Sequence, residues 1–153
     1  MADEAQLLQR LWDLEEIKQL KARYFRLMDT KQWDQWKDLF TEDCVHYLPL
    51  GVNVDVPAQT NEDYLQQVPQ ALSNSITVHH GHMPEITFLS GTEAEGIWAM
   101  FDYVQGADSP AGIHGYGHYY ETYRKCEDGA WRISSKRNAR IRVDQVSYPP
   151  PGQ

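Results

Sequence analysis

Apolar residues recur at spacings of three and four along the first part of the chain, which is the period of an α-helix. The stripe that starts at Leu7 runs through Ile17 and is interrupted at Asp29, after which the same spacing resumes. A third stretch with a helical pattern follows later. The pattern predicts helices over residues 3–28, 32–40 and 61–72. Residues 44–48 fit a short strand, and residues 49–60, with two Pro, a Gly and an Asn, fit an irregular connection.

The second half of the chain changes period and becomes rich in Val, Ile, Tyr, Trp and Thr, which is typical of strands. Gly-containing turn signals separate its segments, so that strands are predicted over residues 76–89, 92–105, 113–126 and 131–147. Helices followed by an antiparallel meander indicate the α+β class. We expect a cone-shaped barrel, in which a strongly curved antiparallel or mixed sheet and the N-terminal helices enclose a pocket. Residues 1–148 would form this single domain, and residues 149–153 a Pro-rich surface tail.

Charge and composition narrow the range of partners. The 153 residues carry a formal net charge of -8, and aromatic residues make up 12%. Such a chain lacks the surplus of Lys and Arg that binds nucleic acid, and the basic run over residues 136–142 fits the polar face of a strand. The two cysteines are far apart in the sequence, and no apolar stretch has the length of a membrane span or a signal peptide. We therefore expect a cytoplasmic protein with a small-molecule substrate and neither a nucleic acid nor a membrane as partner.

Several short motifs occur together in one order and cover residues 14–144. They are residues 17–25, Asp29 followed by Trp33, residues 77–86, residues 115–119 and residues 129–133. In this arrangement the chain resembles the SnoaL-like branch of the nuclear transport factor 2-like superfamily. That branch includes scytalone dehydratase, bile-acid 7α-dehydratase and the dehydrochlorinase that acts on lindane. The resemblance implies the cone fold, catalysis without a metal or cofactor, and a homo-oligomer, either a dimer or a trimer.

Histidine changes its charge near neutral pH and is the usual general base, but it needs a partner that fixes its tautomer. The resemblance assigns these roles to His79 as the base and Asp29 as its partner. Asp29 also stands where an N-cap of the next helix is expected. Because side chains alternate along a strand, His80 competes with His79 for the inward position, and Gly81 or Pro84 could bulge the strand.

Two further catalytic candidates come from pattern and resemblance together. Tyr24 lies on the apolar stripe of the first helix, where a core tyrosine is the ordinary interpretation; the resemblance implies that its hydroxyl donates to a substrate oxygen. Asp102 shares a strand face with Trp98 and other apolar residues, so its carboxylate is expected either at the pocket wall or at a strand end near solvent. There it would orient the base or the substrate.

The remaining pocket candidates are expected to bind substrate rather than to react with it. They are Tyr47, His80, Trp98, Tyr116, His118 and Arg140. For Arg140 the alternative is a solvated strand face, because its neighbours are polar too. The pattern His80-Gly81-His82 resembles the His-x-His of cupin metal sites, but Thr87 occupies the position where those sites require a Glu. A metal site is therefore not expected.

The expected activity is that of a cofactor-independent lyase of the dehydratase type. Through the Asp29–His79 pair it would remove a proton from a hydroxylated or carbonyl-bearing cyclic or aromatic small molecule. A retro-aldol lyase that releases an aldehyde, or a double-bond isomerase, would use the same base. An alternative from another class is a small-ligand binding or dimerisation module without turnover.

Overall fold

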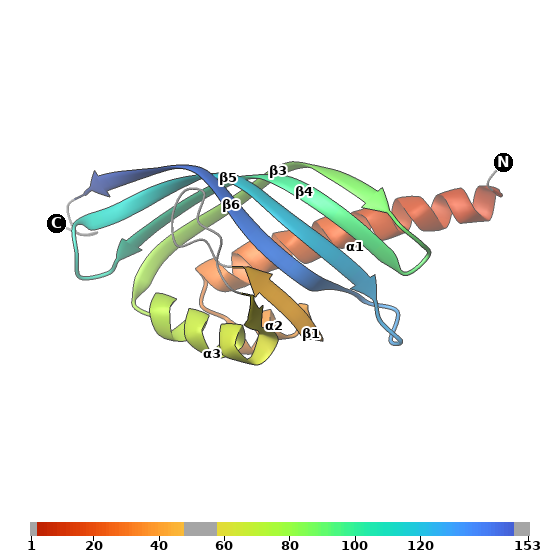
Figure 1. Cartoon of the computed structure of the whole chain (residues 1–153), viewed down its shortest axis with the longest axis horizontal. Helices are drawn as coiled ribbons and strands as arrows, with labels where there is room; N and C mark the ends of the chain where they lie inside the picture. The colour runs from red at the N-terminus through yellow and green to blue at the C-terminus, as the bar shows by residue number, and fades with distance from the viewer. Residues whose placement is uncertain (1–2, 48–57, 149–153) are drawn as a thin grey trace.

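The computed structural model describes residues 3–47 and 58–148, and it consists of one strongly curved sheet with helices on its concave side (Figure 1). The helices are α1 (Glu4–Asp29), α2 (Trp33–Lys37) and α3 (Asn61–Leu72). The strands are β1 (Phe40–Tyr47), β2 (Gln59–Thr60), β3 (Ser75–Phe88), β4 (Glu93–Gly106), β5 (Ala111–Lys125) and β6 (Trp131–Ser147). The predicted α+β class is confirmed.

The sheet has the order β2-β1-β6-β5-β4-β3 in the described part of the chain. The pair β1–β6 is parallel, and all other neighbouring pairs are antiparallel. Because β2 and β3 remain as two free edges, the sheet is an open cone rather than a closed barrel. The long α1 runs diagonally beneath it, with α3 beside the end of α1 (Figure 1).

The core lies between the helices and the concave face of the sheet. Ile17, Leu20, Tyr24 and Leu27 follow the apolar stripe of α1 and are all buried. The start of the same helix projects beyond the sheet, and Leu7 there is 55% exposed. The stripe thus positions the C-terminal half of α1, whose last residue is Asp29.

The second helix is shorter than the predicted 32–40, because α2 ends at Lys37 and Phe40 already begins β1. The backbone N–H of Ile133 donates to the carbonyl of Leu39, and Phe40 pairs with Ile133 in the sheet. Pairing with β6 therefore overrides the local helical spacing. The predicted third helix and the four long strands are confirmed within a few residues, and α3 continues through Pro69. Residue 48 of the predicted strand, residues 49–57 of the predicted irregular connection and the tail 149–153 lie outside the described residues.

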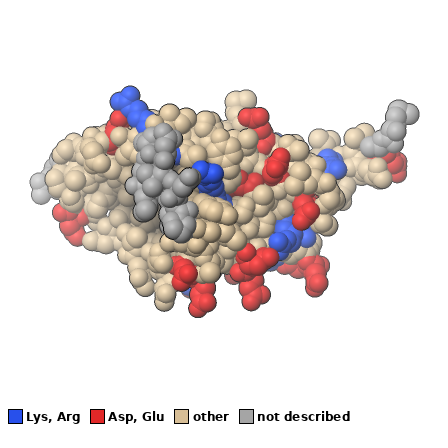
Figure 2. Space-filling view, viewed as in Figure 1, with Lys and Arg blue, Asp and Glu red and all other residues tan. Residues whose placement is uncertain are grey.

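Acidic and basic side chains are interspersed on the face of the described structure seen in Figure 2, without a continuous basic surface. Among the described residues, no helix combines the length and the apolar character needed to cross a membrane.

Candidate active site

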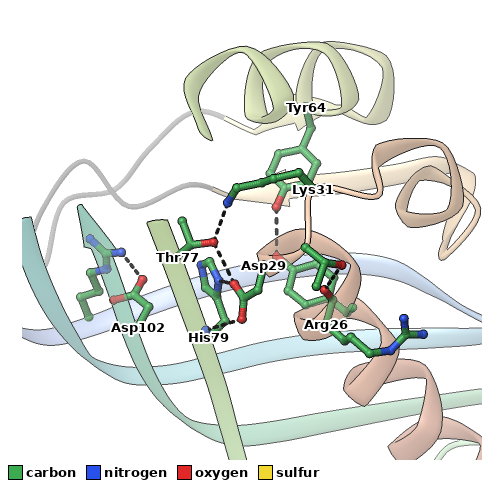
Figure 3. A network of polar contacts seen from close by, with 10 residues as sticks. Arg26, Asp29, Lys31, Tyr64, Thr77, His79 and Asp102 are labelled. Carbon is green, nitrogen blue, oxygen red and sulfur yellow. Dashed lines mark hydrogen bonds and ion pairs between the residues drawn. The ribbon is translucent and has the colours of Figure 1, made fainter. Parts of the chain in front are cut away.

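Asp29, at the end of α1, accepts hydrogen bonds from two residues of β3 (Figure 3). Its Oδ1 accepts from the Thr77 hydroxyl at 2.9 Å, and its Oδ2 accepts from the backbone N–H of His79 at 2.9 Å. The same Oδ1 lies 2.6 Å from Nδ1 of His79. Lys31, whose φ of 59° lies in the left-handed region just after α1, donates from Nζ to the Thr77 hydroxyl at 2.7 Å. These contacts fix the carboxylate against the imidazole.

The contact between Asp29 and His79 also determines which imidazole nitrogen carries the hydrogen. An ionised carboxylate only accepts, so Nδ1 of His79 must donate to it. In the neutral imidazole this leaves Nε2 with a free lone pair, as a general base requires. Both side chains are largely shielded, with 9% of His79 and 21% of Asp29 exposed. Asp29 does not serve as the N-cap of α2, since that position belongs to Gln32.

The choice between His79 and His80 is decided by the register of β3 against β4. His79 pairs with Asp102, whose side chain is buried on the concave face, whereas His80 pairs with Phe101 and is exposed. A bulge does occur in β3, but the register shifts only after His82. It therefore leaves the alternation at His79 intact, and His79 faces the interior.

A cavity of about 210 Å³ opens between the helices and the concave face. On its helical side lie Tyr24, Met28, Tyr64, Val68 and Leu72. On its sheet side lie His79, Asp102, Tyr119, Lys136, Asn138 and Arg140. The cavity joins aromatic walls to a few polar groups, which is the usual composition of a small-molecule site.

Asp102 and Arg140 form an ion pair at the cavity wall, and Asp102 is only 2% exposed. Gly115 stands opposite Asp102 on β5, and a Cβ there would lie 1.9 Å from Oδ1 of Asp102. The glycine therefore provides the space for this carboxylate. Arg140 thus faces the cavity and not solvent, and the alternative of a solvated strand face for it is wrong.

The hydroxyls of Tyr24 and Tyr64 lie 3.2 Å apart at the helical side of the cavity. Burial raises the pKa of both phenols, so both keep their protons near neutral pH. One hydrogen bond between two phenols uses one of the two protons. The other O–H is available to a ligand. The His46 ring stacks on the Tyr64 ring with 3.7 Å between the ring centroids, and this contact holds Tyr64 in place.

Lys136 lines the cavity although it belongs to the basic run that fits the polar face of a strand. It is 1% exposed, and its Nζ donates to Oδ1 of Asn138 at 2.9 Å. Burial, reinforced by the nearby ammonium of Lys21, lowers the pKa of Lys136 to about 7. A lysine that exchanges its proton near neutral pH is thus part of the cavity wall.

This lysine is expected to make folding stability rise with pH between about 7 and 10. In that window the unfolded chain keeps the proton on Lys136 while the folded chain has released it. The free energy of unfolding then increases with pH, by up to about 1.4 kcal/mol per pH unit. Below about pH 7 both states are protonated, and the full cost of the buried charge remains.

Urea unfolding at a series of pH values from 7 to 9.5 would test this expectation, with Lys136→Met expected to lose this part of the slope. Lys18→Met, at a side chain that is 44% exposed, should keep the wild-type slope. Equal slopes in the wild type and Lys136→Met would contradict the expectation.

The other predicted substrate-binding residues lie outside the cavity. The side chains next to them along β3 and β5 point inward, so the convex face carries His80, Tyr116 and His118. Tyr47 is 40% exposed. Trp98 does face inward, but it packs with Met100 and Tyr119 and donates from Nε1 to the Tyr123 hydroxyl at 2.7 Å. The structure therefore brings Asp29, His79, Tyr24, Asp102 and Arg140 together and leaves these five apart. In the described ranges, no group of three or more His, Cys, Asp or Glu side chains could hold a metal ion.

The structure is thus an open α+β cone with an aspartate–histidine pair beside a cavity. The SnoaL-like domain matches residues 9–137 of this chain. The chain therefore belongs to the SnoaL-like family.

Individual proteins are also similar to this chain in sequence or in fold. The chain is 25% identical over 134 residues to the probable cyclase FGR4 of Gibberella zeae, which covers 82% of this chain and 89% of that protein. The fold of the present chain matches that of a putative scytalone dehydratase from Novosphingobium aromaticivorans, with a TM-score of 0.78 and 21% identity. The match covers 95% of this chain and 97% of the dehydratase chain. The fold also matches that of hexachlorocyclohexane dehydrochlorinase LinA type 2, with a TM-score of 0.80, 18% identity and coverage of 95% and 99%. The names of these relatives thus include a cyclase, a dehydratase and a dehydrochlorinase.

Proposed function

We propose that this protein is a cofactor-independent lyase of the dehydratase type, which acts on a hydroxylated or carbonyl-bearing cyclic or aromatic small molecule. The observation that carries the proposal is the 2.6 Å contact between Nδ1 of His79 and Asp29 beside the cavity. A domain that only binds a ligand has no need for such an acid–base pair. The names of two relatives, a dehydratase and a dehydrochlorinase, describe eliminations, which begin with or include loss of a proton from carbon.

In the first step Nε2 of His79 removes a proton from the carbon next to a carbonyl group. The ionised Asp29 stabilises the imidazolium that forms and keeps the ring oriented. Negative charge develops on the carbonyl oxygen, and the phenol O–H of Tyr24 or Tyr64 that is not used in their mutual hydrogen bond donates to it. The surrounding apolar walls strengthen these interactions.

In the second step the carbon–oxygen bond to the β-hydroxyl breaks and a carbon–carbon double bond forms. The imidazolium of His79 returns its proton to the departing hydroxyl, so that water leaves and the base is regenerated. Every proton is accounted for by His79 and the substrate. Asp102 and Arg140 would orient the substrate, because their ion pair forms a fixed polar part of the cavity wall.

The same base supports two other outcomes. Proton removal from the β-hydroxyl would release an aldehyde by a retro-aldol step, and return of the abstracted proton to a different carbon would move a double bond. The product formed distinguishes these reactions from dehydration.

The test has two parts, which separate proton abstraction from elimination. Exchange of the α-protons of 2-tetralone in deuterated buffer, followed by NMR, reports proton abstraction alone. Conversion of a panel of cyclic β-hydroxy ketones, such as 3-hydroxycyclohexanone, to conjugated enones reports elimination through their ultraviolet absorption. We expect the wild type to accelerate both reactions and His79→Gln to lose about 100- to 10,000-fold of that acceleration.

A matched control is His80→Gln, which changes the neighbouring exposed histidine and should retain the activity. Wild-type rates equal to those in buffer for every ketone, with binding retained, would favour a ligand-binding module without turnover. Equal rates in the wild type and His79→Gln would exclude His79 as the base.

A further inference from the structure

The cavity contains a positive group that the proposed elimination does not use. Lys136 lies on β6 with its side chain inward, and it lines the cavity together with Asn138 and Arg140, each two residues further along the strand. Its Nζ lies 5.2 to 5.8 Å from the centroids of the Tyr24, Tyr64 and Tyr119 rings. A fully buried lysine among aromatic rings at the wall of a ligand cavity requires an explanation, since burial of a charge is costly.

The other charged side chains described around the cavity each have a direct polar partner. Asp29 contacts His79, Asp102 contacts Arg140, and the adjacent Lys21 contacts Glu121 at 2.5 Å. Within the described residues Lys136 has no acidic partner in a salt bridge, and its one hydrogen-bond acceptor is the neutral amide of Asn138. An ammonium has three donors, so two remain unused. A protonated Lys136 therefore has no directly bonded counter-charge among the described residues.

We propose that the cavity recognises a ligand with a single aromatic ring through an anionic oxygen, a phenolate or a carboxylate, which pairs with the Lys136 ammonium. The proposal deepens the proposed function, on which it rests for placing the substrate in this cavity. A charged oxygen would supply the direct ionic partner that the described residues do not provide, and it would accept the unused donors. Charge-assisted hydrogen bonds of this kind are the strong ones.

Size and lining favour a single ring. An apolar cavity of about 150 Å³ accepts benzene, so the cavity of about 210 Å³ seen here has room for one substituted ring. Tyr24, Tyr64 and Tyr119 line the cavity, and aromatic side chains form favourable contacts with a ligand ring.

Binding of an anion should be coupled to proton uptake. Because burial lowers the pKa of Lys136 to about 7, part of the protein carries a neutral amine at this position in weakly alkaline buffer. An anionic ligand favours the ammonium and draws a proton from solution. Several other groups also face Lys136 and set its local potential: Lys21, Tyr24, Cys44, His46, Tyr64, Asp102, Tyr119, Glu121 and Asn138. Their charges also act on an anionic ligand, so the part that depends on Lys136 itself is measured with Lys136→Met.

The experiment compares benzoate with benzamide, which have nearly the same shape and differ in charge, by calorimetry at pH 8 in two buffers of different ionisation enthalpy. For the wild type we expect benzoate to bind about 10- to 100-fold more tightly than benzamide and to take up a fraction of a proton. In Lys136→Met both the preference and the proton uptake should be lost. Lys18→Met, at the surface, should behave as the wild type does.

Three results overturn the proposal. The first is equal affinity for both probes in the wild type, which includes no binding of either. The second is benzoate binding by the wild type without proton uptake, and the third is an unchanged preference for benzoate in Lys136→Met. The proton-uptake measurement needs only the wild type, so poor folding of the variant does not remove the test. Benzoate binding that depends on Lys136 but coexists with inactivity towards every ketone would contradict the lyase and leave this proposal intact. Ketone turnover without a preference for benzoate over benzamide would contradict this proposal and leave the lyase intact.

Discussion

Replacing Asp29 by Asn is expected to lower the rate of α-proton exchange by about 100- to 10,000-fold while the protein remains folded. The amide keeps the size of the carboxylate but removes the negative charge that stabilises a His79 imidazolium. It can also donate to Nδ1 of His79 and thereby favour the tautomer whose hydrogen sits on Nε2, where the base needs its lone pair. Exchange rates measured by NMR test the effect on activity, and imidazole nitrogen-15 shifts report the tautomer.

Asp34→Asn is a suitable control, because Asp34 is fully exposed and makes only a weak surface contact with Lys37 at 3.9 Å. It changes the net charge by the same amount as Asp29→Asn. If both variants lose activity equally, net charge and not the contact with His79 would be responsible. If Asp29→Asn keeps the wild-type rate and tautomer, the pair has no role in proton transfer.

The fold was predictable to a large extent because its pattern is regular. The stripe through Ile17 and Tyr24 in α1 and the turn signals between the long strands give the elements and their order without any tertiary information. The exception is the start of β1 at Phe40, where pairing with Ile133 of a strand more than ninety residues later determines the local structure. No local pattern contains that partner.

Within the site, the inward position of Asp102 was predictable because β4 keeps a strict alternation with Trp98 and Met100, both buried. On β5 the inward positions opposite Asp102 and Met100 are Gly115 and Gly117. Glycines carry no side chain that would signal the inner face. The conspicuous Tyr116 and His118 consequently stand on the convex face.

Lys136 could not be placed from the sequence because β6 does not alternate regularly. Counting in twos from the buried Ile133 would put residue 135 inside and residue 136 outside. The register between β5 and β6 shifts between Thr122 and Tyr123, which leaves Ser134 without a register partner on β5 and reverses the parity beyond it. This bulge turns Lys136 and Arg140 into the cavity. A bulge is a property of strand pairing, so the basic run looked like a solvated face.

The second large effect is expected on stability, at the buried pair of Lys21 and Glu121 behind the cavity. Neither side chain has any exposed surface, and Glu121 also accepts from the Tyr123 hydroxyl at 2.6 Å. Glu121→Gln keeps the shape and the acceptor for Tyr123 but leaves Lys21 buried without a counter-charge. We expect the free energy of unfolding to fall by about 3–5 kcal/mol. Urea unfolding curves measure this loss.

Lys21→Met should cost less than Glu121→Gln, because Lys136 lies directly opposite Glu121 on the paired strand and is left as a cation beside that carboxylate. In Glu121→Gln, by contrast, both Lys21 and Lys136 lose the carboxylate of Glu121 as a nearby negative charge. Combining Lys21→Met with Glu121→Gln removes both charges of the pair and should recover most of the loss, since a neutral replacement of a buried pair is often well tolerated. Additive losses in the double variant would show that the two side chains contribute independently, and would contradict the view that an unpaired buried charge is the source of the destabilisation.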